Sequence, residues 1–201
     1  MGAHGTFWYA LVANALQQMV MFGMFGYLAA HLMQTYMLHA GEIALPLALA
    51  GGGVIVSGLL GGRVADHRCR LAWLALACVG SGLLVALVFT ARVSAWGTVA
   101  LAFGVASLAG ISTAVTPTLL LELAGSSRTT ATGLFAVSNQ MGVFGGASLG
   151  GLMLALGGFP LVGFCFLGVA VIAAAVIRLR VRDSAAFLEQ ISLRQGKTAM
   201  E

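Results

Sequence analysis

Long runs of apolar residues most restrict how this chain can fold. Residues 71–91 contain no charged side chain, and several other stretches approach or exceed the roughly 18 residues that mark a candidate membrane span. Of the whole chain, 60% is hydrophobic and 8% is charged, whereas a soluble domain carries roughly 25% charged residues. The sequence therefore predicts an integral membrane protein.

Six stretches are predicted to cross the membrane. Their approximate bounds are 7–32, 43–62, 71–91, 96–122, 130–156 and 160–178. Unpaired backbone groups are costly in lipid, so each span is a helix or part of a closed barrel, and the long unalternating apolar runs exclude a barrel. We expect an all-α fold, with a six-helix transmembrane domain over residues 1–182 and a cytoplasmic tail over 183–201. The first stretch is interpreted as a retained helix, because residues 1–5 lack the basic residue of a signal peptide.

The basic residues indicate an orientation. Of the ten Lys and Arg residues, only Arg92 falls on one side of the six predicted spans. The other nine fall on the opposite side: Arg63, Arg68, Arg70, Arg128, Arg178, Arg180, Arg182, Arg194 and Lys197. By the positive-inside rule, both termini are predicted to be cytoplasmic, in a plasma or inner membrane.

Other functional classes lack their signatures. The basic residues are those that topology demands, so no nucleic-acid partner is expected. Cys69, Cys78 and Cys165 have no metal-ligand spacing, so neither a metal nor a cofactor is expected. No HExxH motif, paired intramembrane aspartates or serine with a matched histidine indicates an enzyme.

Polar side chains gather on particular spans. In the first span Asn14, Gln17, Gln18 and Met21 follow the spacing of one helical face. Amides are costly against lipid, so this face is predicted to line a substrate cavity or to form hydrogen bonds between helices.

Two further spans contribute candidates to such a cavity. The fourth span carries Ser112, Thr113 and Thr116 just before Pro117, where a kink is expected, and the fifth carries Asn139. The hydroxyl groups have an alternative role, because Ser and Thr often bond back to their own helix.

The second and fifth spans are rich in glycine. Gly58 and Gly62, and likewise Gly142, Gly146 and Gly150, have the four-residue spacing that lets helix backbones approach closely. We expect Gly58, Gly142, Gly146 and Gly150 to form tight helix contacts. A phosphate-binding loop is the competing interpretation, but its lysine is missing.

The order polar, glycine-rich, apolar occurs twice along the chain. Three crossings reverse the side on which the next unit begins, so a repeated three-helix unit must be inverted. Such inverted repeats are typical of secondary transporters.

The loop between the second and third spans carries the most specific motif. Gly62, Ala65, Asp66 and Arg70 resemble the loop signature of the major facilitator superfamily, Gly-x-Leu-Ala-Asp-Arg-x-Gly-Arg. The resemblance covers about residues 7–180, which is half of the usual twelve-helix transporter. It implies that the first and fourth helices line a cavity, that the second and fifth flank it, and that the third and sixth lie outside.

The signature also has departures, and other features resemble one half of such a transporter. Val64 replaces Leu, His67 stands where a basic residue is usual, and Cys69 replaces the second glycine. The fourth span lacks the arginine typical of the amino-terminal half of drug-efflux members. Residues 127–133 resemble the cytoplasmic entry to the eleventh helix, so the chain resembles a carboxy-terminal half.

The resemblance implies a cytoplasmic latch. Asp66 would engage the positive N-terminal end of a helix in the opposite half, with Arg70 holding its carboxylate. The gate residues would be Gly62, Asp66, Arg68, Arg70 and Arg128. Alternatively, Asp66 only balances nearby arginines in an exposed loop.

Two functional hypotheses follow. The first is secondary active transport, with efflux of amphipathic small molecules by alternating access, by a half-transporter or a fragment completed by a second six-helix half or a second copy. The second is a truncated membrane protein that binds a partner without transporting anything. Glu42, Glu122 and His31 are all expected near helix ends, so no coupling ion is assigned.

Overall fold

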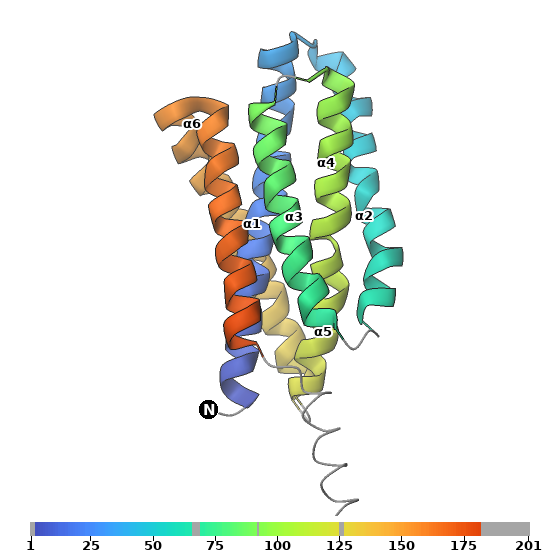
Figure 1. Ribbon diagram of the computed structural model, residues 1–201, viewed down its shortest axis with the longest axis vertical. Helices are drawn as coiled ribbons and strands as arrows, with labels where there is room; N and C mark the ends of the chain where they lie inside the picture. Colours follow the sequence, from blue (N-terminus) through green and yellow to red (C-terminus); the bar gives the residue numbers. More distant parts are fainter. Residues whose placement is uncertain (1–2, 66–68, 92, 125–126, 182–201) are drawn as a thin grey trace, which may run out of the picture.

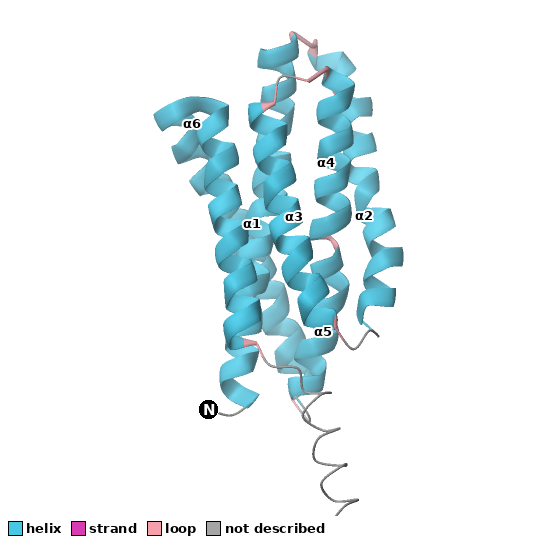
Figure 2. Cartoon of the chain, in the orientation of Figure 1, coloured by secondary structure: helices cyan, strands magenta, loops and turns pink. Residues whose placement is uncertain are grey.

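The computed structural model describes residues 3–65, 69–91, 93–124 and 127–181, and they form a bundle of long helices (Figures 1 and 2). The elements are α1 (Ala3–Tyr36), the 3-10 helix η1 (Ala40–Glu42), α2 (Ala44–Ala65), α3 (Arg70–Thr90), α4 (Ala95–Ala109), α5 (Ile111–Ala124) and α6 (Arg128–Arg180). The all-α prediction is confirmed.

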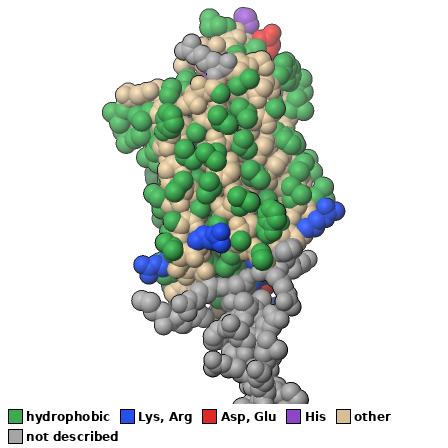
Figure 3. Space-filling view, viewed as in Figure 1, with side chains coloured by type: hydrophobic (Ala, Val, Ile, Leu, Met, Phe, Trp, Pro, Cys, Tyr) green, Lys and Arg blue, Asp and Glu red, His purple; other side chains and the backbone are tan. Residues whose placement is uncertain are grey.

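The described helices are suited to a membrane. Five stretches are long and apolar enough to cross one, judged by length and composition: Gly5–Tyr36, Ala40–Ala65, Arg70–Thr90, Ala95–Ala124 and Arg128–Arg180. Apolar side chains cover much of the face drawn in Figure 3. The exposed large apolar residues include Phe144 and Ile55, which are 76% and 75% exposed. An outer surface of this kind is stable against lipid and not against water.

Helix α6 is broken in its middle. As a straight helix, 53 residues would extend about 80 Å, far beyond the roughly 30 Å hydrocarbon core of a bilayer. Gly157 and Gly158 have non-helical backbone angles, and Gly158 has a φ of 71°, a left-handed conformation that favours glycine. In Figure 1 the orange segment turns sharply at one end of the bundle. The stretches predicted as 130–156 and 160–178 thus lie in one element, on either side of this break.

The close glycine contacts of the two arms of α6 fall on different helices, and Phe166 of the second arm also packs against Gly23 of α1. In the first arm, a Cβ added to Gly142 would lie 2.5 Å from the carbonyl oxygen of Ala15 in α1, and one at Gly146 would lie 2.6 Å from that of Met19. In the second arm, a Cβ at Gly163 would lie 3.2 Å from the Cα of Ala86 in α3. Glycines therefore set these close backbone contacts.

In α2 the close helix contacts are made by Gly53 and Gly61, and not by Gly58, for which the sequence predicted one. A Cβ added to Gly53 would lie 2.8 Å from the Cβ of Ala106 in α4, and one at Gly61 would lie 2.7 Å from that of Ala114 in α5. At Gly58 and Gly62, no described atom lies within 4 Å of an added Cβ. Helix α2 thus packs on α4 and α5 through one glycine face and exposes the other.

The fourth predicted span is interrupted at Gly110, between α4 and α5, whereas α5 continues through Pro117. Gly110 itself keeps right-handed helical angles, with a φ of −66° and a ψ of −17°. A Cβ at Gly110 would overlap the side chain of Ser57 in α2. The close approach of α2 therefore requires glycine at the interruption.

Candidate functional site

Three amide side chains of α1 are buried inside the bundle. Asn14, Gln17 and Gln18 are only 2%, 1% and 2% exposed. They share one side of α1, as the sequence spacing predicted, and this side faces the other helices of the bundle. Met21, the fourth residue of the stripe, is also buried.

The amide nitrogens donate hydrogen bonds to two other helices. Asn14 Nδ2 lies 2.8 Å from Ser138 Oγ and 2.6 Å from Asn139 Oδ1 of α6. Gln18 Nε2 lies 3.2 Å from the same Asn139 oxygen. Gln17 Nε2 lies 2.9 Å from Ser81 Oγ of α3. The amides therefore link α1 to α6 and α3.

The oxygen atoms of these three amides have no hydrogen-bond donor within the described part of the chain. Among the described residues, Asn14 Oδ1, Gln17 Oε1 and Gln18 Oε1 are buried and accept no hydrogen bond. A buried acceptor without a donor costs about 1–3 kcal/mol. These three oxygens can therefore accept hydrogen bonds from a bound molecule or from water.

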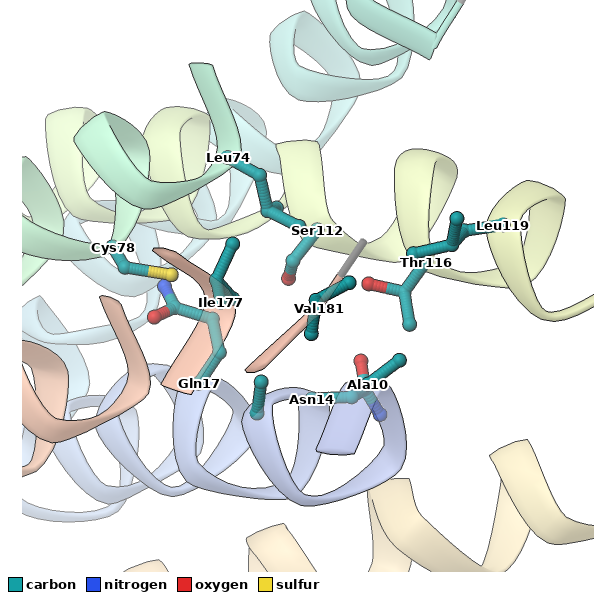
Figure 4. A pocket seen from close by; sticks show the side chains of 11 residues that line it. Ala10, Asn14, Gln17, Leu74, Cys78, Ser112, Thr116, Leu119, Ile177 and Val181 are labelled. Atoms are coloured by element: carbon teal, nitrogen blue, oxygen red, sulfur yellow. The ribbon is translucent and has the colours of Figure 1, made fainter. Parts of the chain in front are cut away.

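A small cavity adjoins two of these amides (Figure 4). Its volume is about 10 Å³, at the lower limit of what can hold one water molecule. Asn14 and Gln17 of α1 line one side and Ser112 and Thr116 of α5 the opposite side. The remaining lining is formed mainly by apolar side chains, which come from α1, α3, α5 and the C-terminal end of α6: Ala10, Ala13, Leu74, Cys78, Leu119, Ile177 and Val181.

The other predicted cavity residues lie elsewhere. Gln18 and Asn139 meet at the interface of α1 and α6, and Met21 does not line the cavity. Thr113 is exposed, and its hydroxyl donates to the Gly110 carbonyl oxygen at 2.6 Å. The Ser112 hydroxyl likewise donates to Ala109 at 2.6 Å, so it is available to a ligand only as an acceptor.

Ser81 and Ser138 were not among the predicted site residues. The structure makes both of them acceptors for the α1 amides. Their hydroxyls also donate to carbonyl oxygens of their own helices, Cys78 and Phe135. The sequence shows that each serine is a polar residue inside a span, but it does not show which helix the serine will contact.

A pair of opposite charges lies at the end of the bundle that carries Arg63, Arg70 and Arg128, which we call the arginine-bearing end. Both terminal nitrogens of the Arg70 guanidinium donate to the Glu122 carboxylate, one of them at 2.8 Å. The Arg70 side chain is 5% exposed and that of Glu122 is 38% exposed. This bidentate pair joins the start of α3 to the end of α5. Glu122 was not among the predicted gate residues.

Of the other four predicted gate residues, the structure describes two. Asp66 and Arg68 lie outside the described residues. Gly62 is exposed in the last turn of α2, and Arg128 is exposed in the first turn of α6. The end of α2, the start of α3, the end of α5 and the start of α6 lie at the same end of the bundle as the beginning of α1 (Figure 1).

A larger groove lies beside the first turn of α6. Its volume is about 400 Å³, and the residues that line it include Phe7 and Trp8 of α1 together with Ser127 and Thr130. The sequence placed the entry to an eleventh-type helix at these α6 residues. Two residues of that predicted entry, Ser127 and Thr130, therefore line the groove.

Comparison with known proteins identifies the family. The Major Facilitator Superfamily model matches residues 10–199, nearly the whole chain. No curated protein matches the chain. The match includes all the described helices apart from the first residues of α1, and hence the amide cluster, the cavity and the ion pair. The chain therefore belongs to the major facilitator superfamily, a family of membrane transporters and not of enzymes.

Proposed function

We propose that the chain is one six-helix half of a secondary transporter that exports amphipathic small molecules by alternating access. Membership of a transporter family supports transport itself. The observation that carries the finer proposal is the cavity between α1 and α5, the first and fourth spans, with polar side chains on both sides and apolar side chains between them. A surface with both kinds of group suits an amphipathic ligand.

Six crossings follow if each arm of α6 spans the membrane. The break at Gly157 and Gly158 supports this count, because it divides a helix that is too long for one crossing. Two inverted three-helix units and two termini on the same side would result. The described arginines lie near the ends of α2, α3 and α6 that share this side, which supports a cytoplasmic assignment.

The cavity is too small for a substrate, so substrate binding requires a conformational change. About 10 Å³ holds no small-molecule substrate, since ligand pockets measure about 300–1,000 Å³. Helices α1 and α5 would have to separate for the amide oxygens to reach a ligand. Opening and closing of this kind is what alternating access requires.

Gly62, Asp66, Arg68, Arg70 and Arg128 are proposed to form the cytoplasmic latch. The Arg70–Glu122 pair supports this role for Arg70, because it holds the guanidinium in a fixed position beside the loop that carries Asp66. The partner of Asp66 would be the first turn of α6 in a second half or a second copy. The exposed glycine face of α2, with Gly58 and Gly62, offers that partner a close approach.

A transport assay tests the cavity. Inside-out vesicles that contain the protein would be energised and given Hoechst 33342, an amphipathic dye. Gln17→Leu removes an unpaired acceptor and should reduce dye transport about tenfold, or ~1.4 kcal/mol. Gln140→Leu is the matched control, because this amide is exposed on α6 and does not line the cavity. Equal activity of both variants would contradict the assigned cavity.

Two further measurements test the latch and the assembly. Asp66→Asn should change the rate of dye transport, and an unchanged rate would remove the latch. Cysteines introduced at Asp66 and Thr130 should form a crosslink between copies if two copies assemble. Partner capture without transport by the wild type would instead support the non-transporting alternative.

A further inference from the structure

A second groove opens toward the outside of the bundle. It lies between α2 and α3, has a volume of about 450 Å³, and is floored by Leu108 of α4 and Ile111 of α5. Helix α2 packs mainly on α4 and α5 and hardly touches α3, which leaves this space open. We call it the α2–α3 groove.

The groove is separate from the candidate transport cavity. Leu74 and Cys78 of α3 line the cavity, whereas Trp73 and Leu76 line the groove. Because these pairs project from different sides of one helix, α3 stands between the two spaces. A ligand of the groove therefore does not belong to the cavity.

The polarity of the groove changes along its length. Trp73 is in the first turn of α3 and Gly80 lies seven residues further, so the groove runs about 10 Å inward from the arginine-bearing end. Apart from Arg63, the residues that line it are apolar or glycine. Arg63 is in the last turn of α2, which places its cation at the outer end.

Arg63 and Trp73 have the positions of interfacial residues. Trp73 is 48% exposed, and tryptophan is enriched at the level of lipid headgroups. Arg63 is exposed and makes no ion pair or hydrogen bond within the described ranges of the chain. Its guanidinium is therefore available to a phosphate, with which arginine forms bidentate hydrogen bonds.

We propose that the α2–α3 groove binds an anionic phospholipid of the cytoplasmic leaflet. Its phosphate lies on Arg63, and one acyl chain lies along Leu60, Leu76 and Ile111. A helix from a partner protein fits less well, because an apolar helix over this groove would bury the Arg63 charge without a counter-charge. The basic mouth and apolar interior match a lipid, with its charged head and apolar chain.

Native mass spectrometry of the detergent-purified protein tests the proposal. Phosphatidylglycerol should bind in preference to phosphatidylcholine at equal concentration. Arg63→Gln should weaken phosphatidylglycerol binding about fivefold, and Arg63→Lys should retain most of it. Arg178→Gln is the matched control, because Arg178 is exposed near the same end, in the last turn of α6. Equal losses in Arg63→Gln and Arg178→Gln would overturn the site.

A second measurement keeps Arg63 intact. In a Trp8→Phe, Trp96→Phe variant, Trp73 is the only tryptophan. Brominated phosphatidylglycerol should quench its fluorescence more strongly than brominated phosphatidylcholine at the same mole fraction, and added salt should reduce the difference. Equal quenching by the two lipids would overturn the proposal, as would displacement of the lipid by glycerol 3-phosphate, which would identify a free-phosphate site.

Discussion

Arg70 and Glu122 form a bidentate ion pair between the start of α3 and the end of α5. The two side chains differ in burial, since Arg70 is nearly enclosed and Glu122 is more than a third exposed. Loss of the acid therefore leaves a cation in a poorly hydrated position, whereas loss of the cation leaves an acid that water can reach.

Glu122→Gln should lower the free energy of unfolding by about 1–3 kcal/mol, because the neutral amide cannot replace a charge-assisted pair. Unfolding can be followed by the reaction of the buried Cys78 thiol with a fluorogenic maleimide, above the earlier reactions of exposed Cys69 and partly exposed Cys165. Glu42→Gln is the control, since Glu42 pairs with His39 in an exposed position and should contribute about 0–1 kcal/mol at most. Equal effects of the two substitutions would contradict the structural role of the pair.

The amides of Asn14 and Asn139 should be energetically coupled. A double-mutant cycle with Asn14→Val and Asn139→Val should give a coupling energy of about 0.6–1.7 kcal/mol, the range of hydrogen bonds between membrane helices. The cycle would be measured by unfolding in mixed micelles. Asn14→Val paired with Gln140→Val should show additive effects, because Gln140 is exposed and no Asn14–Gln140 hydrogen bond is found.

Glycines of similar spacing should differ in their tolerance of a methyl group. Gly142→Ala should destabilise the bundle by about 1–3 kcal/mol, because the added Cβ would meet the Ala15 carbonyl and Gln18. Gly58→Ala should be neutral, or stabilising by up to about 1 kcal/mol through helix propensity, because nothing described lies within 4 Å of the added carbon. Should Gly58→Ala instead weaken crosslinking between copies without loss of stability, the exposed face of α2 would be the contact with the partner.

The break in α6 should depend on Gly158. Gly158→Ala should cost about 1–2 kcal/mol, because its φ of 71° is unfavourable for a residue with a side chain. Gly168→Ala is the control, since it lies within the second arm with open space around the added carbon and should not destabilise the protein. Thermal unfolding of the two variants would check the difference, and equal stabilities would remove the requirement for glycine at the break.

The sequence predicted where helices occur more accurately than where they are interrupted. The apolar runs located α2 and α3 to within a few residues, because long apolar segments in lipid must be helical. The interruption at Gly110, inside the fourth predicted span, was not predicted. Gly110 lies against Ser57 of α2, and a contact between distant segments leaves no periodic pattern in either of them.

The candidate site was likewise predicted only in part from the sequence. The spacing of Asn14, Gln17 and Gln18 placed them on one face of one helix, and their cost in lipid placed that face inside protein. Which helices would meet this face was left open, and the tight contact expected at Gly58 is not found among the described residues. Those outcomes depend on the rotation and packing of each helix against its neighbours.

By itself, the sequence determined a helical membrane protein of the major facilitator superfamily, and it assigned nine of the ten basic residues to one side of the predicted spans. These features follow from local composition, from the length of a membrane span and from one loop motif. Only the tertiary structure decided that Asn14 bonds Asn139, that Arg70 holds Glu122, and that the cavity beside the amides is almost closed. Each of these contacts joins residues far apart in the chain, and its geometry is set when the helices pack.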